Sequence, residues 1–340
     1  MRAVGILLAS ILGIAGCGDD LPPIRYETEK ALIGTDFDLP LCEGDLVRLD
    51  TQIRFVEDFL DAESDEKIEI YVYEDQPPGC PGLGCWNTNL GVVQTLWNSV
   101  DHEVVHAVVA RFASPPAFWS EGIAVALERN GTHEGGATVL DSAAITDERQ
   151  LDYATAGHFV RWLLETRDSA AYPRILNGES VDAIYGASLE DLAAEHEATR
   201  PHAYPPWSPC DYPELTEAEP GIWTETIAVS CSEPDSSSAE GYRFAVPRSV
   251  ELEAGRYELT TTGGVGTRVV GCQMDAWPDP PPSMANGDVP NEVENSQTSV
   301  GLLFHSGSTH ELNLTDGVYK VVVSTEADAE DVTVDLRRVE

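Results

Sequence analysis

Five consecutive residues, His102-Glu103-Val104-Val105-His106, place two imidazoles four positions apart with a carboxylate beside the first. On a helix of 3.6 residues per turn these imidazoles lie on one face, so both can reach one metal ion. Glu103 projects from the flank, where a carboxylate can act as a general base. The opposite face of this predicted helix is apolar and comprises Val100, Val104, Val108 and Phe112.

A second helix is predicted within residues 114–124, where Ser114 and two prolines favour a helix start. This helix carries Glu121. Two histidines and one carboxylate are an established ligand set for catalytic zinc, with a fourth position left for water or substrate. We therefore predict that His102, His106 and Glu121 bind Zn²⁺ and that Glu103 stays free as the base.

With these motifs the chain resembles the gluzincins, which are thermolysin-like and aminopeptidase-like zinc peptidases. In that family a Trp-x-x-Glu-Gly-x-Ala helix follows His-Glu-x-x-His, and residues 118–124 fit except that the Trp stands one residue nearer the Glu. Residues 153–163 fit the later helix of the peptidase MA-like domains found in bacterial envelope proteins. The resemblance covers about residues 41 to 200. It implies an α+β zincin-like metallopeptidase domain that hydrolyses peptide bonds.

The same resemblance gives a candidate for stabilising the oxyanion that forms during hydrolysis. Tyr153 aligns with the tyrosine of the family's later helix, and we predict this role for it ahead of His158 and Tyr185. Packing at a helix start is the alternative role for Tyr153. Thermolysin-like enzymes place an Asp four residues after the ligand Glu to orient a histidine, but Val125 stands there. The partners of the free ring nitrogens are therefore not identified from the sequence.

The amino terminus predicts export. An apolar run within residues 1–16 is typical of a signal peptide, and small residues before Cys17 form a lipobox-like sequence. We expect a cell-envelope lipoprotein attached to the membrane by lipid on Cys17, with an ordinary secretory cleavage site as the alternative. Residues 17–40 are expected to be an acidic tether.

Six further cysteines are an even number, which favours three disulfides in an exported chain. Cys80 and Cys85 would close a local loop. Cys231 and Cys272 fall in predicted neighbouring strands, which would leave Cys42 to pair with Cys210. Zinc binding by these residues is less favoured, because the sequence has no Cys-x-x-Cys pair.

The formal net charge of −39 disfavours nucleic acid and anionic membrane surfaces as partners. It could favour basic substrates, although solubility or adaptation to salt is the commoner reason for such a charge. We expect a peptide or protein substrate, and the sequence does not indicate an oligomeric state.

The chain is long enough for two domains. Within the predicted catalytic domain, residues 41–203, we expect a helix over 46–62 and strands over 67–73 and 90–96. Residues 86–95 are a candidate edge strand for docking an extended peptide, with a plain sheet strand as the alternative.

A Pro-rich linker is predicted over residues 204–222, followed by an all-β sandwich over 223–340. The sandwich resembles the pre-peptidase C-terminal domains of secreted bacterial proteases, and residues 275–299 are an expected insertion in it. A second hypothesis is a non-catalytic envelope lipoprotein that uses the metallopeptidase scaffold to bind a protein or glycan. The intact Glu103 favours the enzyme, because a structural zinc site would not require it.

Overall fold

The computed structural model describes residues 21–37, 41–129, 132–201, 203–204, 212–233, 235–239, 243–272, 301–314, 316–326 and 330–339. The predicted signal peptide, the lipidation site at Cys17 and the insertion over 275–299 lie outside these residues. Among the helices so described, none combines the length and apolar character needed to span a bilayer.

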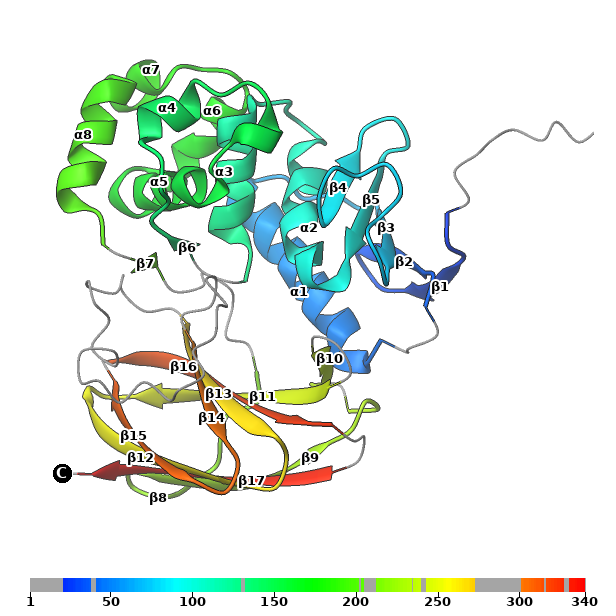
Figure 1. Cartoon of the computed structure of the whole chain (residues 1–340), viewed down its shortest axis with the longest axis vertical. Coiled ribbons are helices and arrows are strands. Elements are labelled where there is room, and N and C mark those ends of the chain that lie inside the picture. The colour runs from blue at the N-terminus through cyan, green and yellow to red at the C-terminus, as the bar shows by residue number, and fades with distance from the viewer. Residues whose placement is uncertain are drawn as a thin grey trace, which may run out of the picture.

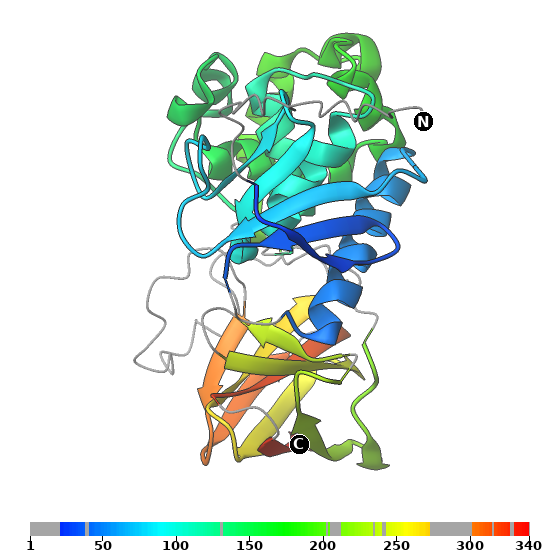
Figure 2. The same cartoon turned by 90° about the vertical axis from the view of Figure 1, so that its right-hand side faces the viewer.

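A mixed five-stranded sheet is the first layer of the amino-terminal unit (Figures 1 and 2). Its order is β1-β2-β3-β5-β4; the β2–β3 and β3–β5 pairs are parallel, and the two outer pairs are antiparallel. Ile68, Ile70 and Val72 of β3 face the main core, and Tyr71 and Tyr73 face the other side. The strands are β1 (Ile24–Glu27), β2 (Ala31–Thr35), β3 (Ile68–Tyr73), β4 (Gly84–Asn87) and β5 (Val92–Leu96).

The predicted tether over 17–40 is wrong in its second half, because β1 and β2 belong to this sheet. Distant contacts hold the hairpin in place. The Asp50 carboxylate of helix α1 (Glu43–Leu60) accepts hydrogen bonds from Thr28 Oγ1 at 2.5 Å and from the backbone N–H groups of Glu29 and Lys30, both at 3.0 Å.

Among the described residues, eight helices lie to one side of the sheet and extend away from it (Figures 1 and 2). Helix α3 and helix α5 pack closely through glycine: a Cβ at Gly122 would lie 2.5 Å from Val160 Cγ2, and one at Gly157 would lie 2.2 Å from Val125 Cγ1. Helix α3 begins at Ala117 with Pro116 as N-cap residue, so the predicted Ser114 cap is wrong. The helices are α1 (Glu43–Leu60), α2 (Val100–Val109), α3 (Ala117–Leu127), α4 (Val139–Ala143), α5 (Tyr153–Thr166), α6 (Tyr172–Leu176), α7 (Val181–Tyr185) and α8 (Leu189–Thr199), with 3-10 turns at Trp97–Ser99, Glu148–Gln150 and Ser169–Ala171.

Two antiparallel sheets form the carboxy-terminal unit, with orders β10-β11-β16-β13-β14 and β15-β12-β17-β9-β8. Apolar side chains from both sheets share one core, as expected for a β-sandwich. Strands β6 (Thr132–His133) and β7 (Ala203–Tyr204) pair with each other in a separate two-stranded sheet outside the sandwich. The sandwich strands are β8 (Glu217–Glu219), β9 (Ile222–Val229), β10 (Ser237–Ala239), β11 (Arg243–Leu252), β12 (Gly255–Thr262), β13 (Gly266–Cys272), β14 (Gly301–His305), β15 (Thr309–Leu314), β16 (Gly317–Thr325) and β17 (Glu330–Val339).

The predicted linker over 204–222 is also wrong at both ends. Tyr204 belongs to β7, whereas Leu215 is buried in the sandwich core and β8 pairs with β9. The sequence is Pro-rich and acidic here, but Tyr204 and Leu215 have places in the two units.

A disulfide joins the two units at the start of α1. Cys42 pairs with Cys231, so the predicted pairs Cys42–Cys210 and Cys231–Cys272 are both wrong. Cys231 follows β9 and faces the amino end of α1, a proximity that spacing along the chain does not reveal; Cys210 lies outside the described residues. The local pair Cys80–Cys85 is confirmed.

Hydrogen bonds reinforce this junction. Asp45 of α1 is fully buried, and its Oδ2 accepts from the backbone N–H of Ser238 at 2.8 Å and from the Ser238 hydroxyl at 2.6 Å. Gly44 leaves room for the sandwich backbone, since a Cβ there would lie 2.1 Å from the Ser236 carbonyl oxygen.

Candidate metal centre

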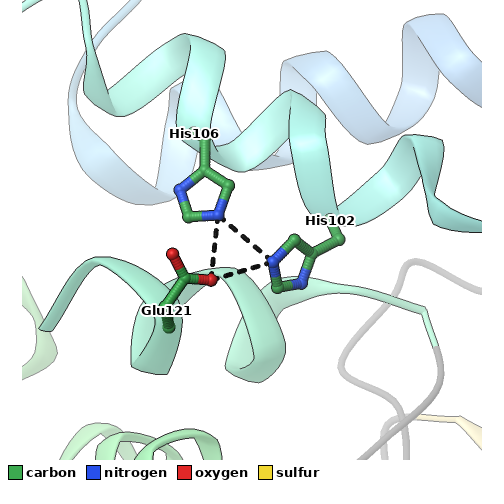
Figure 3. A group of neighbouring side chains, drawn as sticks. All are labelled: His102, His106 and Glu121. Carbon is green, nitrogen blue, oxygen red and sulfur yellow. Dashed lines mark hydrogen bonds and ion pairs between the residues drawn. The ribbon is translucent and has the colours of Figure 1, made fainter. Parts of the chain in front are cut away.

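Three side chains from two helices converge on one point (Figure 3). His102 and His106 project from the same face of α2, and Glu121 meets them from α3. The two Nε2 atoms are 3.1 Å apart, and each lies 3.2 Å from Glu121 Oε2. The structure therefore brings together the three residues predicted as ligands, and this group could hold a metal ion.

The donor set fits a small divalent cation. Tetrahedral zinc with ligand distances of about 2.0 Å separates its ligand atoms by about 3.3 Å, close to the spacings found here. His102 Nδ1 faces a carboxylate and so carries the ring proton, which leaves the Nε2 lone pair directed at the other two acceptors. Acceptors at this distance repel one another unless a cation or a proton lies among them.

Without a metal ion, a proton can relieve this repulsion, and the pKa directions agree with that. Burial lowers the pKa of His102, but hydrogen bonds with Glu121 and Glu128 outweigh it and hold that pKa well above its ordinary value. Burial would raise the pKa of Glu121, yet the two imidazoles lower it to about 2. The site thus attracts positive charge.

The structure supplies the partners of the free ring nitrogens that the sequence left unidentified. Glu128 Oε2 accepts from His102 Nδ1 at 2.9 Å, and Ser120 Oγ lies 3.2 Å from His106 Nδ1. Val125, at the position of the family's Asp, instead packs against Gly157 of α5. Glu128 stands seven residues after Glu121, two helical turns further on the same side. This spacing could have identified Glu128 from the sequence as a partner of the metal centre.

Glu103 lies beside the three ligands without sharing their point of convergence. It is 6% exposed, and burial raises its pKa above the ordinary value against the opposing charge of His102 and His106. A Cβ at Gly84 of β4 would lie 2.8 Å from Glu103 Oε1 and 2.6 Å from Thr95 Oγ1. The absent side chain at Gly84 therefore leaves the space that the Glu103 carboxylate occupies.

If the site performs the peptide hydrolysis that the sequence predicts, Gly84→Ala should displace this carboxylate and lower kcat by about 10- to 100-fold, since misplacement by about 1 Å is that costly. Zinc content should not change, because the ligands come from α2 and α3. Gly82→Ala is the matched control, since a Cβ there meets nothing within 4 Å. Equal kcat values for the two variants, with metal content measured in both, would contradict this role of Gly84.

Tyr153 is the first residue of α5 and lies next to the metal centre. Its ring centroid is 6.1 Å from that of His102, and the residue is 38% exposed. Asp152 caps the helix by accepting from the backbone N–H of Thr155 at 3.1 Å, and it also accepts from the N–H of Ala137, outside the helix, at 2.9 Å. Partial burial and the charge of Glu121 raise the pKa of Tyr153, so its hydroxyl keeps its proton at neutral pH.

The two reserve candidates for oxyanion stabilisation are not at this site. His158 is fully buried, and its Nδ1 lies 3.0 Å from His196 Nε2 in the helical core. Tyr185 ends α7, where Asp168 and Arg167 are its charged neighbours. Of the three candidates, only Tyr153 contacts a predicted ligand.

The candidate docking strand over 86–95 spans a hairpin in which only β4 is at an edge. β5 pairs with β3 and β4, so it is an inner strand. β4 pairs with β5 alone among the described strands, and its Gly84 lies against Glu103. The edge beside the site is therefore Gly84–Asn87.

Comparisons with known proteins assign no family. No protein-family model and no curated protein matches the chain. A solved structure described as TmCBM61 in complex with β-1,4-galactotriose is 15% identical over 37% of this chain and 88% of its own, with a TM-score of 0.16. Hydroxypropylphosphonic acid epoxidase from S. wedmorenis is 10% identical over 52% of this chain and 85% of its own, also with a TM-score of 0.16. Likenesses this weak carry no argument about this chain.

Proposed function

We propose that this protein is a zinc-dependent peptidase of the gluzincin type. The observation that carries the proposal is the convergence of His102 Nε2, His106 Nε2 and Glu121 Oε2, with the buried carboxylate of Glu103 beside them but outside the ligand set. A binding site for structural zinc would need the ligands and would have no use for Glu103.

Zinc, when bound, polarises a substrate carbonyl and lowers the pKa of water, which makes a nucleophile available at neutral pH. Glu103 takes the proton from the attacking water and delivers it to the leaving amine. Its raised pKa suits both transfers, because a base with a pKa nearer the working pH also serves better as an acid. Tyr153, which keeps its proton, donates a hydrogen bond to the developing oxyanion.

Substrate binding along β4 follows from the same arrangement. An extended peptide can add to an edge strand through main-chain hydrogen bonds, and β4, an edge strand among the described residues, begins beside the base. Main-chain recognition of this kind needs a peptide or an unfolded segment of protein. We further propose that the peptidase is exported and attached to the cell envelope through lipid on Cys17, as its amino-terminal sequence indicates.

The test is the metal content of the purified protein together with its hydrolysis of a broad peptide library. We expect one zinc per chain, hydrolysis of some library members, loss of both on dialysis against a chelator, and recovery on adding zinc. Protein with stoichiometric zinc that cleaves no peptide would overturn the peptidase; protein that binds no zinc would overturn the ligand assignment.

A further inference from the structure

An ion pair runs beside the hydrogen bond that orients His102. Asp101 precedes His102 in α2, and Arg129 follows Glu128 just after the end of α3. Arg129 Nε lies 3.8 Å from Asp101 Oδ2. These two residues are the chain neighbours of Glu128 and His102, whose contact is 2.9 Å long. Arg129 is only 8% exposed, so water screens this pair weakly. The two interactions together join the same two segments.

Glu128 is the C-cap residue of α3, where helix ends fray, and Arg129 restrains the chain directly after it. α3 ends at Leu127, and Glu128 has extended backbone angles, with φ −66° and ψ 163°. Beyond its bond to the Ala124 carbonyl, the helix no longer fixes the direction of the chain. The side chain of Arg129 therefore anchors the segment that presents the Glu128 carboxylate.

The sandwich holds one end of the Arg129 guanidinium. Its Nη1 donates to the Tyr212 hydroxyl at 3.0 Å, whereas its other groups donate to Gln52 Oε1 at 3.2 Å and to the Arg48 carbonyl at 3.0 Å, both on α1. The Tyr212 carbonyl accepts from Ser249 Oγ of β11 at 2.9 Å.

Tyr212 is thereby fixed to the sandwich. Its ring lies 5.7 Å from Lys320 Nζ of β16, which is a cation–π distance. Leu215, three residues later, is buried in the sandwich core and donates its N–H to the Ser249 carbonyl at 2.8 Å. The hydroxyl that faces Arg129 is thus presented by the second unit.

We infer that Tyr212 is a positioning residue for the metal centre, acting through Arg129 on Glu128 and through Glu128 on the ring of His102. The inference rests on the proposed metal site. It gives the sandwich a part in metal affinity, in addition to any binding role of its own.

Metal affinity of the full chain tests the inference, measured with Co²⁺ and Zn²⁺ in competition with a chelator. Loss of a direct partner of a ligating histidine typically costs 10- to 100-fold in affinity, so Tyr212→Phe, two contacts beyond that partner, should cost about threefold to tenfold. Tyr257→Phe is the matched control, because its buried hydroxyl donates to the Glu253 carbonyl at 2.8 Å within the sandwich. It should leave affinity unchanged.

A double-mutant cycle separates positioning from general destabilisation. If Tyr212 acts through Glu128, Tyr212→Phe should have no further effect on affinity in a Glu128→Gln background. Should Tyr212→Phe fail to fold, Ser249→Ala carries the same expectation, since it removes only the hydroxyl that fixes the Tyr212 carbonyl.

The outcomes are distinct. Wild-type protein that binds neither metal overturns the proposed function, and this inference with it. Wild-type affinity in Tyr212→Phe, or an equal loss in both backgrounds, overturns the inference and leaves the proposed peptidase standing.

Discussion

Replacing Glu103 by Gln is expected to lower kcat for peptide hydrolysis by about 10²- to 10⁴-fold, the usual contribution of a positioned acid–base group. The amide keeps the shape of the carboxylate and so preserves the contact with Gly84. It cannot accept the proton of the attacking water. Zinc content should stay at one per chain, because Glu103 is outside the group formed by His102, His106 and Glu121.

The measurement is single-turnover hydrolysis of the best library peptide, with metal content determined on the same samples. Glu190→Gln, at an exposed position in the first turn of α8, makes the same chemical change away from the site. If the kcat of Glu103→Gln is within tenfold of the wild-type value, Glu103 is not the general base. Loss of zinc in this variant would instead make Glu103 a contributor to metal binding.

Acidification is expected to destabilise the protein through the buried pair His158–His196. Burial lowers the pKa of His158 to about 3 and that of His196 to about 4. In the unfolded chain both rings take up a proton near pH 6.5. Between the folded and the unfolded pKa values the unfolded state therefore binds more protons than the folded state. As a result, the free energy of unfolding falls as pH falls below about 6.5.

At pH 5 each histidine accounts for about 2 kcal/mol of this loss, or about 4 kcal/mol together. That is a large part of the 5–15 kcal/mol typical of a folded domain. Denaturant unfolding at pH 7, 6 and 5 measures it. His196→Gln keeps a donor for His158 Nδ1 but cannot titrate, and comparison with it cancels the contribution of the metal centre. The variant should show a pH dependence weaker by about one proton, and parallel curves would rule out His196 as a source of acid sensitivity.

The parts of the fold that local periodicity controls could be predicted. The i, i+4 spacing places His102 and His106 on one face whatever surrounds the helix, and strand β3 follows from the alternating residues of its segment. The convergence of Glu121 on the two histidines is tertiary, and it was indicated by the ligand set that catalytic zinc uses and by the likeness to the gluzincin motif.

What the sequence did not predict depends on long-range contacts. The hairpin β1–β2 looks like an acidic tether until Asp50 and the parallel partner β3 are present. The pairing of Cys42 with Cys231 depends on how the two units pack against each other. Glu128 was missed because the expected spacing led to Val125, whose space is defined by Gly157 on another helix.

The early start of β1 also limits how far the protein can reach. If Cys17 carries lipid, as we propose, only six residues separate it from Ile24, where the sheet begins. Even fully extended, seven residue steps cover roughly 25 Å. A tether ending at residue 40 would have let the amino-terminal unit move far from the membrane, whereas this short connection would hold it close to the lipid surface. Its substrates would then be the membrane-proximal segments of neighbouring proteins, or peptides that diffuse along the envelope.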